Sequence, residues 1–303
     1  TAIAAGSRAT GINAISIGVN SIANGSNAQS FGVGAEATGT NAVAIASNSK
    51  SSGDDAMAIG VKANATGTNT IAFGTNANAS GDGAMAFGSA ANASATDSMA
   101  IGVNAIASAN NATAVGHSAL ASSNNAMALG LYSEASGEVA VAIGMKAVAT
   151  SSDTLAAGAY SKAGGANAIA VGTSANAAFS NSMAIGSTAN AAAINAMAIG
   201  TRASAATLDA FAAGLEATAN GVNSMALGMK SEASSTNAFA AGSFAKALAT
   251  NALAYGTSAT ASGANAMATG TNSVASGTDS IASGVGSQAN QTMAIAFGPY
   301  SKA

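Results

Sequence analysis

Few side chains in this sequence could carry acid–base, nucleophilic or metal chemistry. Charged residues make up 7% of its 303 residues, it has no cysteine, and its one histidine is His117. An average soluble protein is about one quarter charged. Two carboxylates in a cleft could cleave a glycosidic bond, but Asp54 and Asp55 are adjacent in a Ser/Gly-rich turn. His117 has no second histidine with which to hold a metal, so a surface or turn role is expected for it. The pair Gly32/Gly34 lacks the third glycine and the helix of a phosphate loop. We therefore expect no catalytic, cofactor-binding or metal-binding residues, and no enzyme activity.

The charge balance and the distribution of apolar residues argue against two classes of partner. Twelve acidic and nine basic residues give a net charge of −3, which offers no basic surface for nucleic acid. No run of about 18 uninterrupted apolar residues is present, so we expect no membrane insertion. A charged-then-apolar leader is also missing at Thr1, which predicts a mature fragment.

A 14-residue repeat fills the chain. Stepping by 14 from Gly18 reaches Gly32 and Ala46, and continues without a slip to Gly298. Counted from Ala4, 22 positions are equivalent and 20 of them are glycine, which we call the glycine column. Because a fixed period decides the architecture, residues 1–303 are predicted to form a single repeat domain of about 22 coils.

The residues around the glycine column predict two short strands in each repeat. Large apolar residues lie one and three places before the glycine with a small residue between them, as in Met57-Ala58-Ile59 before Gly60. This alternation is typical of a strand, and the heptad spacing of a coiled coil is absent. A second alternating strand is predicted from two to six places after the glycine. Nine places after it, Asn or Asp occurs in 18 of 21 repeats, which predicts a turn whose side chains stack in ladders. The fold class is therefore all-β: a β-solenoid of 14-residue coils, with the coils stacked into a rod roughly 100 Å long.

The small and the charged columns together predict which side chains face outward. All nine basic residues lie two or four places after the glycine, among them Arg202 and Lys230, which with Glu216 are predicted to form an alternating charge ladder. Charged residues must face water, so the columns of small residues, which lie two places before the glycine and three and five places after it, face inward. A coil whose interior holds only Ala and Ser has closely spaced walls, which leave no room inside for large residues. The column of large apolar residues one place before the glycine is therefore predicted to point outward, opposite the charges, and to form an interface between copies of the chain. The alternative is that this stripe fills the coil's own interior and the protein is a monomer. The predicted interface residues are Ile17, Phe31, Ile45, Ile59, Phe73, Phe87, Ile101, Ile143, Ile185, Ile199, Leu227 and Phe297.

Outward aromatic residues predict a ligand-binding patch. Tyr132, Lys146 and Tyr160 share the column two places after the glycine on three successive coils, which places a cation between two rings. Leu131 and Met145 flank them. Exposed aromatic residues with a basic neighbour are typical of protein-binding hot spots. The alternative is that the rings stack to stiffen the rod.

The repeat resembles the head repeat of YadA-like trimeric autotransporter adhesins. The segments 181–189 (Asn-Ser-Met-Ala-Ile-Gly-Ser-Thr-Ala) and 223–231 (Asn-Ser-Met-Ala-Leu-Gly-Met-Lys-Ser) are similar to that family's signature, Asn-Ser-Val-Ala-Ile-Gly, two variable residues and Ser. The resemblance covers the whole chain. It implies a left-handed parallel β-roll assembled as a homotrimer, located at a bacterial cell surface and anchored in the outer membrane. It also implies binding of a host matrix protein or a host cell receptor.

Departures from the family signature limit what the resemblance implies. Met dominates the Val position and Ala often replaces the final Ser, so collagen binding in particular is not expected to transfer. The neck, stalk and membrane anchor of the family have no counterpart among these repeats. Two other functions stay open: an ice-binding solenoid, which needs a flat threonine array, and a structural segment of a phage or secreted fibre.

Overall fold

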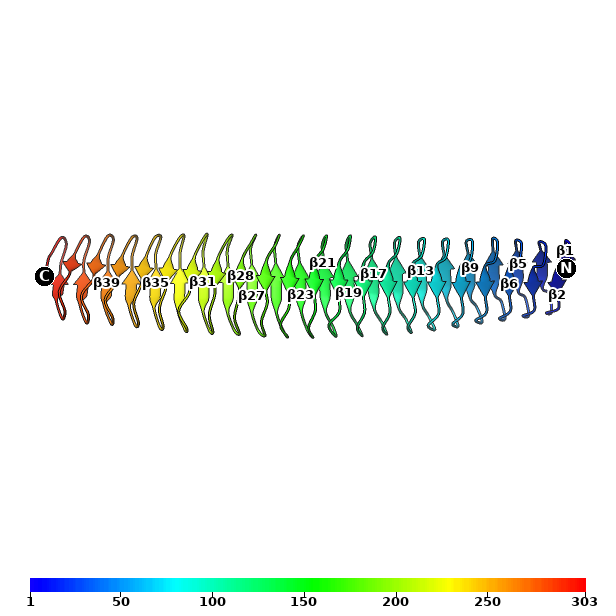
Figure 1. The fold of residues 1–303 in the computed structure, drawn as a ribbon, viewed down its shortest axis with the longest axis horizontal. Coiled ribbons are helices and arrows are strands. Elements are labelled where there is room, and N and C mark those ends of the chain that lie inside the picture. The colour runs from blue at the N-terminus through cyan, green and yellow to red at the C-terminus, as the bar shows by residue number, and fades with distance from the viewer. The chain divides into compact units, whose positions relative to one another are not determined.

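The computed structural model describes all residues from 1 to 303, which form a parallel β-solenoid without helices. The chain divides into two compact units, Thr1–Asp153 and Thr154–Ala303, which are built from the same coil. Each coil contains a strand of three residues, a turn, a strand of two residues and a second turn (Figure 1). We call the odd-numbered strands of a unit its first face and the even-numbered strands its second face.

The first unit holds β1 to β22, with three residues in each first-face strand except β1. Its first face is β1 (Ala2–Ile3), β3 (Ile15–Ile17), β5 (Gln29–Phe31), β7 (Val43–Ile45), β9 (Met57–Ile59), β11 (Ile71–Phe73), β13 (Met85–Phe87), β15 (Met99–Ile101), β17 (Thr113–Val115), β19 (Met127–Leu129) and β21 (Val141–Ile143). Its second face is β2 (Arg8–Ala9), β4 (Ile22–Ala23), β6 (Glu36–Ala37), β8 (Lys50–Ser51), β10 (Asn64–Ala65), β12 (Asn78–Ala79), β14 (Asn92–Ala93), β16 (Ile106–Ala107), β18 (Leu120–Ala121), β20 (Glu134–Ala135) and β22 (Val148–Ala149).

The second unit holds β23 to β43 in the same alternation. Its first face is β23 (Leu155–Ala157), β25 (Ile169–Val171), β27 (Met183–Ile185), β29 (Met197–Ile199), β31 (Phe211–Ala213), β33 (Met225–Leu227), β35 (Phe239–Ala241), β37 (Leu253–Tyr255), β39 (Met267–Thr269), β41 (Ile281–Ser283) and β43 (Ile295–Phe297). Its second face is β24 (Lys162–Ala163), β26 (Asn176–Ala177), β28 (Asn190–Ala191), β30 (Ser204–Ala205), β32 (Thr218–Ala219), β34 (Glu232–Ala233), β36 (Lys246–Ala247), β38 (Thr260–Ala261), β40 (Val274–Ala275) and β42 (Gln288–Ala289).

Strands pair in parallel with a register of one coil. On the first face of the first unit, Ile71 lies beside Met57 and Met85. On the second face, Asn78 lies beside Asn64 and Asn92. Each column of the sequence therefore becomes a row of neighbouring side chains within a unit, and the predicted fold of 14-residue coils is confirmed.

The interior of the coils consists of small side chains. Ala44, Ala58 and Ala72 are fully buried, and the largest fully buried side chains of the chain are Thr70 and Thr154. The sequence predicted three inward columns, two places before the glycine and three and five places after it. The structure adds a fourth, ten places after the glycine, which holds Thr70 and Thr154. No side chain larger than threonine is fully buried, so the larger side chains reach the surface of the chain.

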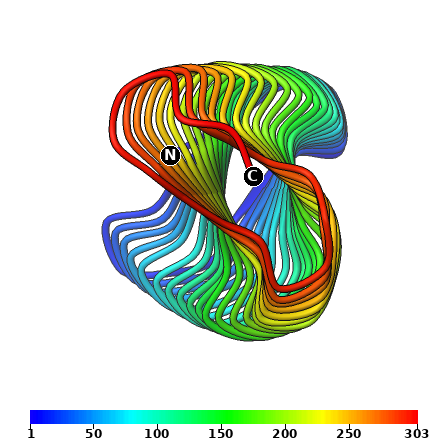
Figure 2. The same ribbon diagram turned by 90° about the vertical axis from the view of Figure 1, so that its left-hand side faces the viewer.

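Two kinds of turn join the faces and form two edges, seen end-on in Figure 2. The glycine edge comprises the glycine column and the two residues after it, such as Gly74, Thr75 and Asn76. Gly74 has φ +138°, and a Cβ atom there would lie 2.4 Å from the carbonyl oxygen of Gly88. The next residue but one, Asn76, has φ +56°, in the left-handed region. The predicted second strand was therefore too long: it occupies only the fourth and fifth places after the glycine, because the second place belongs to the turn.

The asparagine edge comprises the residues seven to nine places after the glycine and carries the predicted ladders. The Nδ2 atom of Asn27 donates to Oδ1 of Asn41 over 3.0 Å, and Asn41 donates in the same way to Asp55 over 2.9 Å. These residues have φ of +56° to +58°, a left-handed conformation that Asn and Asp tolerate. An Asp accepts the bond but has no amide to donate, so each ladder of this kind ends at an Asp. The predicted turn and its side-chain ladders are confirmed.

Candidate interface and ligand-binding surface

The first face presents a row of large apolar side chains to solvent, which is continuous from Ile3 to Ile143 in the first unit and is interrupted by residues such as Ala157, Ala213 and Ser283 in the second. The side chain of Phe73 is 51% exposed and that of Ile101 is 37% exposed, although each follows a fully buried alanine in its strand. The rings of Phe73 and Phe87 lie side by side, with centroids 6.3 Å apart. Of the twelve predicted interface residues, Ile17, Ile45, Phe73, Ile101, Ile143 and Phe297 are exposed, and Phe31, Ile59, Phe87, Ile185, Ile199 and Leu227 are half-buried. The predicted outward orientation of this column is confirmed, since none of these side chains lies inside its own coil.

The second face is mostly polar and carries charges, as predicted for the side opposite the apolar row, although Ile22, Ile106 and Leu120 also lie in its outward column. Lys50 pairs with Glu36 on the preceding coil, with Nζ and Oε2 3.7 Å apart. Asn64 donates to Asn78, and Asn78 to Asn92, over 2.8 Å each. Such pairs join adjacent coils of the second face through their side chains, in addition to the backbone hydrogen bonds of the sheet.

Four of the five residues of the predicted binding patch lie in the first unit. Leu131, Tyr132, Met145 and Lys146 are all exposed on its glycine edge. The ring of Tyr132 meets the ring of His117 from the preceding coil edge-on, at 5.4 Å and 69°. Sequence reasoning gave His117 only a surface or turn role. The spacing could have placed it in the patch, because it lies one place after its glycine and Tyr132 two places after the next.

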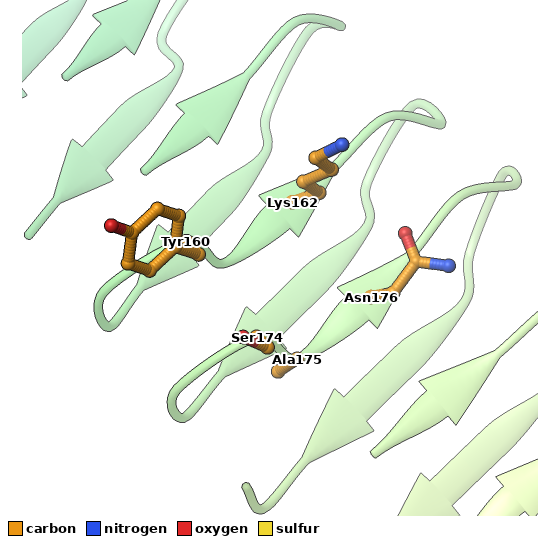
Figure 3. A pocket seen from close by; sticks show the side chains of 5 residues that line it. All are labelled: Tyr160, Lys162, Ser174, Ala175 and Asn176. Carbon is orange, nitrogen blue, oxygen red and sulfur yellow. The ribbon is translucent and has the colours of Figure 1, made fainter. Parts of the chain in front are cut away.

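Tyr160, the fifth residue of the predicted patch, lies in the second unit. It is exposed and lines an open hollow of about 470 Å³ together with Lys162, Ser174, Ala175 and Asn176. The tyrosine ring stands at the glycine edge, whereas the lysine and asparagine rise from the second face (Figure 3). The placement of a cation between the rings of Tyr132 and Tyr160 involves both units and stays a prediction.

The predicted alternating charge ladder is present in the second unit. Glu216 pairs with Arg202 on one side and with Lys230 on the other, with nitrogen–oxygen distances of 2.5 and 3.6 Å. The Nζ atom of Lys230 also lies 5.7 Å from the ring centroid of Phe244, on the following coil. Sequence reasoning did not connect Phe244 to the ladder. The shared column, two places after the glycine, was the available indication.

The acidic residues considered for catalysis have structural partners. Asp54 accepts a hydrogen bond from the backbone N–H of Thr40 over 2.7 Å, and Asp55 ends the ladder that begins at Asn13. The His117 ring nitrogen Nδ1 lies 3.1 Å from the hydroxyl of Ser118. No group of three His, Cys, Asp or Glu side chains lies together in a way that could hold a metal ion. The structure also contains no helix with the length and apolarity needed to cross a membrane.

Comparison with known protein families identifies one family for this chain. No characterised protein matches the chain. The model of the YadA head domain repeat, which describes two copies of the repeat, matches residues 9–28, 30–45, 51–77, 79–105, 93–119, 107–133, 121–147, 163–189, 180–203, 208–231, 233–259, 247–273, 254–279 and 275–301. Because these matches cover most of both units coil after coil, the chain belongs to the family of YadA head domain repeats, an adhesin-type family of cell-surface autotransporters.

Proposed function

We propose that residues 1–303 form the head of a non-enzymatic adhesin that assembles as a homotrimer. The head is held at a bacterial cell surface through an outer-membrane anchor. It binds a host matrix protein or a host cell receptor through its lateral surface. Family membership supports the adhesin role, and the fold is of a non-enzymatic kind.

The exposed apolar first face is the observation that carries this proposal. Fully burying one large apolar side chain is worth about 1.5–3 kcal/mol, and these side chains are already partly covered within their own chain. Burying the rest then contributes roughly 1 kcal/mol per residue on average, with more from the exposed phenylalanines, or about 12 kcal/mol per chain for the twelve residues. An apolar surface of this kind marks an interface, and three copies meeting along their first faces would cover it.

The same assembly leaves the second face and the glycine edge in contact with water. These surfaces carry the charged ladders and the predicted patch of Leu131, Tyr132, Met145, Lys146 and Tyr160. Repetition suits binding by such a surface, because many weak contacts on one head, and many heads on one cell, multiply the strength of attachment.

Two experiments test the proposal in order. Light scattering of the purified chain should give three times the monomer mass. The intact protein is then applied to immobilised fibronectin, laminin, collagen and epithelial receptors, together with the variants Tyr132→Ala and Tyr160→Ala. Tyr300→Ala is the matched control, because Tyr300 is an exposed tyrosine in the same column outside the patch.

Four results bear on this proposal. We expect weaker binding for Tyr132→Ala and Tyr160→Ala and unchanged binding for Tyr300→Ala. If all three variants bound as strongly as the unmodified protein, the predicted patch would be rejected as a binding site. A monomer that binds none of these proteins would reject the adhesin head itself, and thermal hysteresis in the same sample would favour an ice-binding solenoid.

A further inference from the structure

The two edges of the coil demand the same backbone conformation but contain different residues. Each has one residue per coil in the left-handed region, with φ near +57° at both Asn41 and Arg202. On the asparagine edge that residue is Asn or Asp in 18 of 21 coils. On the glycine edge it is Asn or Gly in only 8 of 22, and in none of the eleven coils from Ser118 to Ser258.

This difference points to a role for the glycine edge other than forming a turn. Tyr160 and Phe244 have φ of +60° and +59°, a conformation in which large side chains are disfavoured and Gly and Asn are accepted. Non-glycine residues held in this region gather at functional sites, where another requirement outweighs the backbone strain. The identity of the strained residues therefore indicates binding along this stretch of the edge.

In the second unit these residues form a compact exposed cluster, which we call the Phe244 patch: Leu215, Met229, Lys230 and Phe244. The three apolar side chains are 41–42% exposed on successive coils. Lys230 lies over the Phe244 ring at 5.7 Å, so the aromatic and the cationic group share one surface. Exposed Phe and Met side chains are enriched at protein interfaces, so this cluster has the composition of a protein-binding surface rather than that of a solvated turn.

The charges around the Phe244 patch favour an anionic partner. The side chains of Arg202, Lys230 and Lys246 are 63%, 49% and 50% exposed. Glu216 and Glu232 are less exposed, at 31% and 38%, and both are already paired with these cations. The outermost charges are therefore positive, although the whole chain has a net charge of −3.

The same residue types occur six coils earlier in the sequence. Leu131 corresponds to Leu215, the pair Met145-Lys146 to Met229-Lys230, and the segment 160–162 (Tyr-Ser-Lys) to 244–246 (Phe-Ala-Lys). These positions vary freely in most other coils. Recurrence of the whole set is not required by the coil, whose own columns are the glycine and the small inward residues.

We propose that the Phe244 patch is a second binding site, which takes an acidic segment of a partner protein that also carries apolar side chains. The apolar side chains of that segment pack on Leu215, Met229 and Phe244, while its carboxylates meet Lys230 and the neighbouring cations. This inference rests on the proposed function, since it names the chemistry of one partner of the adhesin surface.

The test measures binding and stability in the same variants of the full chain. The probe is a fluorescent synthetic peptide in which Glu alternates with Leu and Phe, and the control peptide has Lys in place of Glu. Phe244→Asn places a residue suited to the left-handed turn at the patch. Ser258→Asn is the matched control, because it makes the equivalent change in the next coil, where the side chain is small.

We expect Phe244→Asn to weaken binding of the acidic peptide about tenfold while raising the unfolding temperature by about 2 °C. Ser258→Asn should raise the unfolding temperature by a similar amount and leave binding unchanged. The Lys-containing peptide should bind at least about tenfold more weakly than the acidic one.

Equal binding of the two peptides would overturn the inference, as would unchanged binding by Phe244→Asn. A lower unfolding temperature for Phe244→Asn would also overturn it, because the ring would then be present for stability. If the protein is a trimer that binds a host protein but the peptides do not behave as expected, only the Phe244 patch is rejected. If the peptides behave as expected but the protein is a monomer that binds no host protein, only the proposed function is rejected.

Discussion

Replacing Phe73 by serine removes a large apolar side chain from the middle of the exposed first face. Its ring is 51% exposed in the isolated chain, and its main aromatic neighbour is Phe87, at a centroid distance of 6.3 Å. A phenylalanine buries about 150–250 Å² when fully covered, so roughly 100 Å² stays available for a partner chain. At about 25 cal/mol per Å², covering that area contributes about 2.5 kcal/mol per copy, or about 7 kcal/mol per trimer.

The expected loss is large enough to appear as dissociation. Since about 1.4 kcal/mol is a factor of ten, the association constant of the trimer should fall by about five orders of magnitude. The assay is sedimentation velocity or light scattering over a dilution series. Because the trimer constant depends on the square of the monomer concentration, the midpoint of dissociation should move to about two to three orders of magnitude higher protein concentration.

A matched control separates loss of the interface from loss of an exposed phenylalanine. Phe244 is 42% exposed but lies on the glycine edge, where the proposed trimer leaves it in water. Phe244→Ser should therefore leave the dissociation midpoint in place. An unmoved midpoint for Phe73→Ser, or an equal movement for both variants, would refute the assignment of the first face as the interface.

Three further substitutions test the coil itself. Ala46 occupies the glycine column with φ +97°, so Ala46→Gly should raise the free energy of unfolding by about 1 kcal/mol in chemical denaturation. Ala44→Gly, in an ordinary strand, should lower it. A change of the same sign in both variants would contradict the role of φ. Ala198 is fully buried between coil walls of small residues, and Ala198→Leu should cost about 3 kcal/mol or more, so an unchanged denaturation midpoint would mean that the interior is not closely packed. Asn181 accepts from Asn167 and donates to Asn195, each over 3.1 Å. In thermal unfolding, Asn181→Ala should lower the stability by about 1–2 kcal/mol. Asn181→Asp should lower it by less, because Asp keeps the hydrogen-bond acceptor and the turn preference. Equal losses for the two variants would show that the ladder does not stabilise the protein.

Much of the fold could be predicted because each structural requirement recurs in every coil. The glycine column follows from a backbone that approaches the next coil closely, and the Asn and Asp column from a left-handed turn with stacked amides. Where the residue contradicts the conformation, the prediction failed: Tyr132 and Lys230 carry no turn preference, so the second strand was drawn through them. Tertiary contacts between coils, rather than local preference, hold these residues in the turn.

The candidate surface was predictable by column but not by contact. Outward exposure of Phe73 follows from the small inner residues of the coil, and the exposure of Tyr132 follows from its place in a column that holds charged residues in other coils. The meeting of His117 with Tyr132, and of Lys230 with Phe244, depends on side-chain rotamers on adjacent coils. A pattern of residue types does not specify rotamers, so these two contacts could not be predicted from the sequence.

The one-coil register makes the length of this protein adjustable. Within a unit, apart from the hydrogen bonds inside its own turns, each coil pairs its backbone with the coil before it and the coil after it, at a constant offset. Deleting or duplicating fourteen consecutive residues therefore brings together two surfaces that already fit. Unequal recombination between such similar stretches of coding sequence would add or remove whole coils and leave a protein that still folds. The length of the protein can therefore evolve separately from the side chains that bind a partner.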